Sequence, residues 1–209
     1  MNQHPVDAAI AASLPLAMAP RYGDLAELPV GTKRLIVSSN GLFLQVRSPA
    51  IHACMRVSEV SGPLPYGEVE PFIHLRAGPV PKDILRVAVE RAVAAYPNET
   101  AFAVIRDADG TGYEIADVPI RSSSQGHVCY TDTLDDDALV FDVHSHGPHP
   151  SFFSLQDDES DRMRRGPYIS LVLGTSKDEA STTLAARFTC SPYLIDLHGT
   201  QLQKMGLIA

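Results

Sequence analysis

The sequence has few of the features that mark secreted, membrane-spanning or nucleic-acid-binding proteins. Its three cysteines, Cys54, Cys129 and Cys190, are an odd number and include no C-x-x-C pair, which argues against a disulfide framework and a cysteine zinc clamp. No run of 18 apolar residues offers a membrane-spanning helix. Basic residues are scarce, since 17 Lys and Arg face 25 Asp and Glu, a net charge of −8 that disfavours phosphate backbones and anionic lipids. We expect a cytoplasmic, disulfide-free protein with no nucleic-acid or membrane partner.

The first third of the chain predicts a small β-rich region after a poorly ordered start. The 209 residues are 44% hydrophobic, which is enough for one principal core. Four prolines predict a poorly ordered segment over residues 1–30. Asn40-Gly41 lies between apolar runs, which is a hairpin signal, and a third strand is expected at residues 51–57. These strands define a β-rich region over residues 31–70, which ends after the Pro- and Gly-rich stretch 61–67.

Residues 71–209 predict a mixed α/β domain. Apolar residues at helical spacing indicate an amphipathic helix over residues 81–96. A second helix is expected to begin at Ser154, because acidic residues occupy its first turn and a basic cluster, Arg162, Arg164 and Arg165, lies near its end. Residues 122–126 are predicted as a loop. Strands are predicted at residues 100–105, 112–120, 138–143, 169–173 and 182–188.

Three of the eight histidines fall within six residues, at positions 144, 146 and 149. On a strand, residues two apart point to one face, so His144 and His146 would lie close enough to share a metal ion. Imidazole nitrogen suits Zn²⁺, and a catalytic zinc keeps three protein ligands and an open water position. The pair therefore requires a third ligand.

The third ligand is predicted downstream, in the pattern His-x-His-x(7)-Ser-x(2)-Asp. Ser154 and Asp157 complete this pattern, whose chance expectation is roughly 0.002 per chain of this composition. Ser154 with Asp157 alone would indicate a helix N-cap. Together with the two histidines, the spacing favours a metal site.

This pattern resembles the metal signature of the JAMM family, the MPN/JAB-type zinc metalloproteases related to ubiquitin isopeptidases, over residues 75–190. His-Ser-His-Gly followed by Phe-Phe-Ser also resembles the PRTRC system protein A family. The resemblance implies a JAMM/MPN (cytidine-deaminase-like) mixed β-sheet flanked by helices, with a small β-rich N-terminal extension. It implies Zn²⁺ bound by His144, His146 and Asp157, with Ser154 helping to hold the tetrahedral intermediate. The implied partners are a ubiquitin-like protein or its conjugate and a ThiF-related adenylating enzyme.

The family also needs a glutamate where the first helix passes into the next strand, and Glu99 stands at that junction. A carboxylate that begins a buried strand is uncommon without a task, whereas Glu90 lies on the solvated side of the predicted helix. The resemblance implies that Glu99 takes a proton from water and later delivers it to the leaving amine. Glu114 and Glu70 are the replacements to consider if Glu99 lies far from the metal.

Some alternatives stay open. Asp142 alternates onto the face of His144 and could support the metal site or compete for the ion, whereas His149 is expected to be a solvated loop residue rather than a fourth ligand. Gly147 and Phe153 depart from the family pattern, which commonly has proline at both places. The predicted function is a zinc-dependent peptidase or isopeptidase acting on a ubiquitin-like tail. The alternatives are a non-catalytic MPN-type scaffold and a zinc hydrolase of a small amide, and an extended groove beside the metal would favour the peptide.

Overall fold

The structure is a computed structural model, and residues 4–208 are described. The chain divides into two compact units, with the division between His74 and Leu75. Within the described residues, no helix has the length and apolar character needed to cross a membrane. The division falls a few residues after the predicted edge at residue 70, because the chain returns from the Pro- and Gly-rich loop to add one more strand to the first sheet.

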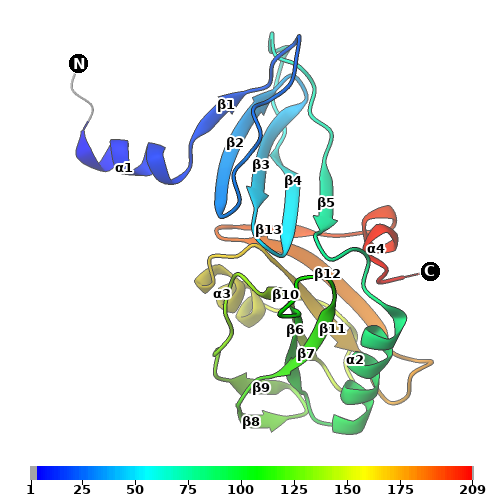
Figure 1. Cartoon of the computed structure of the whole chain (residues 1–209). Helices are drawn as coiled ribbons and strands as arrows, with labels where there is room; N and C mark the ends of the chain where they lie inside the picture. The colour runs from blue at the N-terminus through cyan, green and yellow to red at the C-terminus, as the bar shows by residue number, and fades with distance from the viewer. Residues whose placement is uncertain (1–3, 209) are drawn as a thin grey trace. The chain divides into compact units, whose positions relative to one another are not determined.

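The first unit is built on one five-stranded sheet, with the strands in chain order (Figure 1). Its strands are β1 (Leu16–Met18), β2 (Thr32–Ser38), β3 (Gly41–Arg47), β4 (Ile51–Ser58) and β5 (Phe72–Leu75). β2 and β3 form the hairpin predicted at Asn40-Gly41, and β3 pairs antiparallel with β4. Ile36, Phe43 and Cys54 are buried together in the core of this unit. The predicted β-rich N-terminal region is therefore confirmed.

The predicted lack of order over residues 1–30 is wrong for α1 (Pro5–Ser13) and β1. Pro5 occupies the first turn of α1, where the missing N–H group would have had no helical partner. β1 pairs in parallel with β2, and the carbonyl oxygen of Pro15 accepts a hydrogen bond from the Leu35 amide at 2.8 Å. Prolines therefore sit where the backbone tolerates them. Residues 1–3 lie outside the described part of the chain.

The second unit contains a six-stranded mixed sheet in the order β13-β12-β11-β10-β6-β7. β10 and β11 are parallel, and the other neighbours are antiparallel. The bounds are β6 (Ala101–Arg106), β7 (Tyr113–Asp117), β10 (Leu139–Ser145), β11 (Tyr168–Gly174), β12 (Thr183–Cys190) and β13 (Tyr193–Asp196). This mixed α/β unit and the β-rich first unit agree with the fold that the resemblance implied.

Three helices accompany this sheet: α2 (Lys82–Ala95), α3 (Leu155–Met163) and α4 (Thr200–Met205). α2 contacts β7 and buries Ala88 and Ala92, as its apolar spacing predicted. α3 contacts β12 and β13, and it begins after Ser154 as predicted. α4 and β13 were not predicted.

The predictions of one strand over residues 112–120 and a loop over residues 122–126 are wrong. β7 ends at Asp117, and β8 (Ile120–Ser124) pairs with β9 (His127–Tyr130) in a separate two-stranded sheet. Pro119 lies between β7 and β8 and has no N–H group to continue a ladder. The residues of β8 are exposed and serine-rich, so only their pairing with β9 reveals a strand.

The central strand β10 should dominate the stability of the second unit. Phe141 on β10 is fully buried, and its neighbours across the sheet are Val104 and Ile169. Phe141→Ala is expected to lower the free energy of unfolding by about 3–5 kcal/mol, because it removes apolar contacts and leaves a cavity. Met163, which is 87% exposed at the end of α3, provides the control, and Met163→Ala should change stability by less than about 0.5 kcal/mol. Urea denaturation measures both effects, and an equal loss of unfolding free energy in Phe141→Ala and Met163→Ala would contradict this role of β10.

Candidate metal centre

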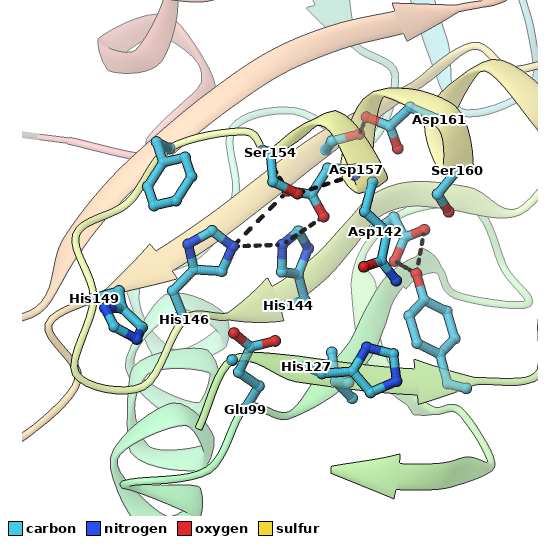
Figure 2. Close-up of a pocket in the computed structure, with 16 residues that line it drawn as sticks. Glu99, His127, Asp142, His144, His146, His149, Ser154, Asp157, Ser160 and Asp161 are labelled. Atoms are coloured by element: carbon cyan, nitrogen blue, oxygen red, sulfur yellow. Dashed lines mark hydrogen bonds and ion pairs between the residues drawn. The ribbon is translucent and has the colours of Figure 1, made fainter. Parts of the chain in front are cut away.

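The end of β10 and the first turn of α3 bring three potential metal ligands together (Figure 2). His144 lies on β10, and the His146 amide extends the pairing with β11 by donating to the Leu173 carbonyl at 2.8 Å. Asp157 occupies the third position of α3. Since β10 is parallel to β11 and buried at the centre of the sheet, its end offers a fixed platform for the two imidazoles.

The distances between the donor atoms suit one tetrahedral ion. His144 Nε2 lies 3.2 Å from His146 Nε2 and 3.3 Å from Asp157 Oδ1, and His146 Nε2 lies 3.9 Å from Asp157 Oδ2. Two ligands held about 2.0–2.1 Å from a tetrahedral zinc are about 3.3 Å apart. His144, His146 and Asp157 therefore fit a zinc ion, and their ligand atoms all lie within 4.8 Å of one another.

Neighbouring groups leave the lone pairs of these donors available. His146 Nδ1 lies 3.2 Å from the Pro150 carbonyl oxygen, which only accepts, so Nδ1 carries the proton and Nε2 has a free lone pair. Asp157 Oδ2 accepts hydrogen bonds from the Ser154 amide and hydroxyl, each at 2.7 Å, while Oδ1 faces His144. Burial lowers the pKa of His144 and of His146, which favours the neutral imidazoles that metal binding requires.

Ser154 combines a position beside the metal ligands with a structural role. Its side-chain oxygen accepts a hydrogen bond from the Asp157 amide at 3.2 Å. The Asp157 carboxylate in turn accepts a hydrogen bond from the Ser154 amide, so the two residues form a capping box. The helix-cap interpretation of this pair and the metal-site interpretation are therefore compatible.

Removal of the Ser154 hydroxyl should loosen the start of α3. Ser154→Ala is expected to lower the free energy of unfolding by about 1 kcal/mol, because the Asp157 amide loses its partner. Ser154→Asn keeps a capping oxygen and should recover most of that loss. Thermal unfolding of the metal-free variants measures both effects, and an unchanged alanine variant would show that the cap contributes nothing.

Glu99 faces the metal ligands from the opposite side of the cavity. Its side chain lines the same cavity as His144, His146 and Asp157, and Figure 2 shows its carboxylate directed toward the two imidazoles. The residue is 8% exposed. Burial, followed by repulsion from Asp157, raises the pKa of Glu99 to about 7. Among the described residues that line this cavity Glu99 is the only glutamate, and neither Glu114 nor Glu70 lines it.

Hydrogen bonds to two neighbouring segments fix the backbone around Glu99. The Glu99 amide donates to the Ser124 carbonyl at 2.8 Å, and the Ser123 hydroxyl donates to the Glu99 carbonyl at 2.5 Å. On the next residue, the Thr100 amide donates to the hydroxyl of buried Ser145 at 3.0 Å. The β8–β9 hairpin and the end of β10 thus hold the base of the Glu99 side chain.

The backbone conformation at residue 147 explains why glycine stands there in place of the proline that is common in the family. The φ of Gly147, +53°, is in the left-handed region, and a Cβ there would lie 2.4 Å from the Pro97 carbonyl oxygen. Proline, with φ fixed near −65°, cannot adopt this conformation. Glycine therefore allows the loop after His146 to approach the segment that carries Glu99.

The two residues left open by the sequence lie in the cavity wall. Asp142 accepts hydrogen bonds from the Tyr130 hydroxyl at 2.9 and 3.0 Å, and it lies outside the group of three metal donors. Burial raises the pKa of Asp142 to about 6. His149 lines the cavity but also lies outside the donor group.

The cavity, with a volume of about 320 Å³, continues along α3 and β9. A second hollow shares five lining residues with it: Val128, Tyr130, Asp142, Gln156 and Ser160. Apart from Asp142, these residues were not predicted to line the site. A faint signal was available, because Gln156 and Ser160 are four residues apart on a predicted helix and share one face.

Comparison with known protein families agrees with this arrangement. Residues 81–189 match the family described as prokaryotic homologs of the JAB domain, and residues 4–76 match a domain of unknown function, DUF2016. The first match covers more than half of the chain, so the protein belongs to the prokaryotic JAB-domain family. A search of curated proteins finds no match. The predicted membership of the JAB/MPN family is confirmed.

Proposed function

We propose that this protein is a zinc-dependent metallopeptidase or isopeptidase of the JAMM type, which hydrolyses a bond at the C-terminal tail of a ubiquitin-like protein or its conjugate. The observation that carries the proposal is the convergence of His144, His146 and Asp157 in one cavity with the buried carboxylate of Glu99. A scaffold without metal chemistry would need none of these residues in this geometry.

The roles of the side chains follow from their positions. When bound to the three donors, zinc would activate a water molecule and polarise the scissile carbonyl group. Glu99, on the opposite side of the cavity from Asp157, accepts the proton of the attacking water and passes it to the leaving amine (Figure 2). The Ser154 hydroxyl turns from Asp157 Oδ2 and donates to the oxygen that gains negative charge.

The shape of the site supports a peptide rather than a small amide as substrate. The hollow extends from the metal donors along α3 and β9, with Val128 and Gln156 among the residues shared by its two parts. An extended tail could occupy such a groove, whereas a small amide would use only the part beside the donors.

The PRTRC resemblance supports a more specific proposal about partners. It suggests a ubiquitin-like protein as substrate and a ThiF-related adenylating enzyme as a functional neighbour. None of the three cysteines, all of which lie in the described part of the chain, forms a disulfide, and we expect the reaction in the cytoplasm, where thiols stay reduced.

A cleavage assay tests the proposed function. Zinc-loaded protein is incubated with ubiquitin that carries a C-terminal peptide extension, with an isopeptide-linked ubiquitin dimer, and with a small acetyl-glycine anilide. We expect cleavage after the C-terminal residue of the ubiquitin tail, and loss of cleavage in Glu99→Gln. Turnover of the anilide alone would favour the small-amide hydrolase. Binding of ubiquitin without cleavage, in protein that holds zinc, would favour the scaffold.

A further inference from the structure

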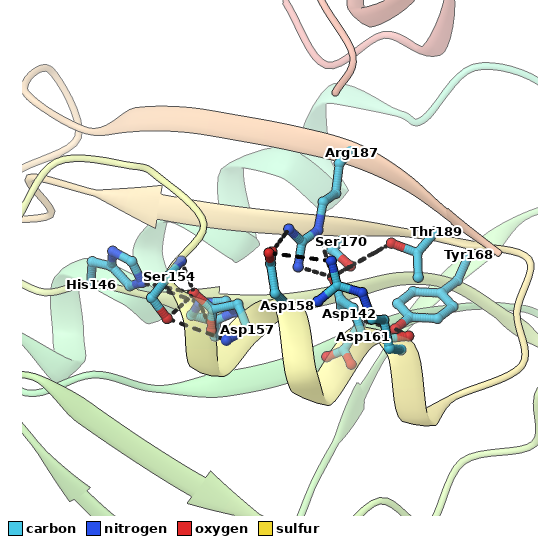
Figure 3. A network of polar contacts seen from close by, with 12 residues as sticks. Asp142, His146, Ser154, Asp157, Asp158, Asp161, Tyr168, Ser170, Arg187 and Thr189 are labelled. Atoms are coloured by element: carbon cyan, nitrogen blue, oxygen red, sulfur yellow. Dashed lines mark hydrogen bonds and ion pairs between the residues drawn. The ribbon is translucent and has the colours of Figure 1, made fainter. Parts of the chain in front are cut away.

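A buried arginine from β12 joins the helix that carries Asp157 to the central sheet (Figure 3). Arg187 is 3% exposed, and its guanidinium group contacts two carboxylates of α3. Its Nε donates to Asp161 Oδ2 at 2.7 Å, and its Nη1 donates to Asp158 Oδ1. Two charged hydrogen bonds in a buried place hold a planar group in one orientation.

The same guanidinium group also covers an aromatic ring at the start of the helix. The Arg187 Cζ atom lies 3.9 Å from the centre of the Phe153 ring. Phe153 immediately precedes Ser154, and Asp158 immediately follows Asp157. Arg187 therefore contacts the residues on both sides of the capping box that contains Ser154 and Asp157.

Asp161 of α3 is also hydrogen-bonded to the central sheet. Asp161, which is 7% exposed, accepts hydrogen bonds from the Ser170 hydroxyl at 2.6 Å and from the Tyr168 hydroxyl at 2.9 Å. Ser170 and Tyr168 lie on β11, the parallel neighbour of the strand that carries His144. A continuous set of contacts thus runs from β11, through Asp161 and Arg187, to Asp158 in the first turn of α3.

We propose that Arg187 is a positioning residue of the metal centre. It holds the first turn of α3, and with it Ser154 and Asp157, at the correct distance from His144 and His146. This inference rests on the proposed zinc site, but it concerns the arrangement of the chain's own residues.

Zinc affinity in a lysine variant provides the first test. Arg187→Lys keeps the charge but loses the planar contact with Phe153 and one of the two directed hydrogen bonds. We expect it to weaken zinc binding by about 10–100-fold in competition with a chromophoric chelator, the usual loss when groups that orient metal ligands are changed. Phe153→Leu, which keeps an apolar side chain but removes the ring, should weaken binding in the same direction.

Arg164→Lys is the matched control. Arg164 lies at the other end of α3 and forms ion pairs with Asp132 and Asp136. Its Cζ atom lies 5.6 Å from the centre of the Tyr168 ring. Its replacement should lower the melting temperature without changing zinc affinity. Equal zinc affinity in wild type, Arg187→Lys and Phe153→Leu would overturn the proposal, as would an equal loss in Arg164→Lys.

Amide hydrogen exchange in metal-free protein separates this inference from the proposed function. The Asp157 amide, which donates to Ser154 Oγ, should exchange at least about 10-fold faster in Arg187→Lys than in wild type or Arg164→Lys. If wild type binds no zinc, the proposed function fails and amide exchange still decides whether Arg187 positions the turn. Unchanged exchange at Asp157 would overturn the positioning role.

Discussion

Replacement of His144 and His146 together with alanine should abolish zinc binding. The variant keeps only the Asp157 carboxylate, and one oxygen ligand cannot hold the ion in competition with solvent and buffer. Elemental analysis after reconstitution should give one zinc per chain for wild type and none for the double variant. Zinc at 100 times its dissociation constant should also stabilise wild type by about 2.7 kcal/mol and leave the variant unchanged.

His149→Ala is the control for this experiment, because His149 lines the same cavity outside the donor group. It should retain one zinc per chain. A double variant that still holds one zinc, or a His149 variant that loses it, would assign the ion to other ligands.

Glu99→Gln should separate metal binding from turnover. The amide has the size of the carboxylate but cannot accept a proton, so hydrolysis should fall about 10²–10⁴-fold while zinc remains bound. The cleavage assay on the extended ubiquitin substrate, with zinc content measured on the same samples, checks both parts.

Glu114→Gln provides the matched control, because Glu114 lies on β7 and does not line the cavity. Full activity is expected for it. Full activity of Glu99→Gln, or loss of activity in Glu114→Gln, would remove Glu99 from the role of general base.

The donor group could be predicted because its geometry is local. Alternation along one strand places His144 beside His146, and the spacing from the Ser154 cap to Asp157 is one helical turn. Glu99 could be identified because a buried carboxylate at the start of a strand conflicts with ordinary burial preferences. The distance between strand and helix, which decides whether the three donors meet, required the structure.

The buried polar contacts could not be predicted because their partners are far apart in the sequence. Arg187 is 29 residues from Asp158 and 26 residues from Asp161 in the sequence, yet it contacts both. Arg164 was expected as part of a basic cluster that complements the helix dipole, yet its side chain is 8% exposed and paired with Asp132 and Asp136. Polar residues on a short helix look solvated in a sequence, and only tertiary contacts distinguish the buried face from the exposed one.

The secondary-structure errors have a similar origin. The exposed residues of β8 and the short strand β1 carry no alternating apolar pattern, so their order depends on pairing with β9 and β2. Strand preference depends strongly on such context. The β8 error bears on the site, because Ser123 and Ser124 of this strand hold the Glu99 backbone.

Anomalous diffraction at the zinc absorption edge, from crystals grown with zinc, locates the bound ion and its ligands. We expect one strong peak within about 2.0–2.2 Å of His144 Nε2, His146 Nε2 and Asp157 Oδ1, with the Glu99 carboxylate facing the ion without binding it. A peak at other residues, a peak ligated by Glu99 in place of Asp157, or no peak at this site in zinc-containing crystals would contradict this assignment.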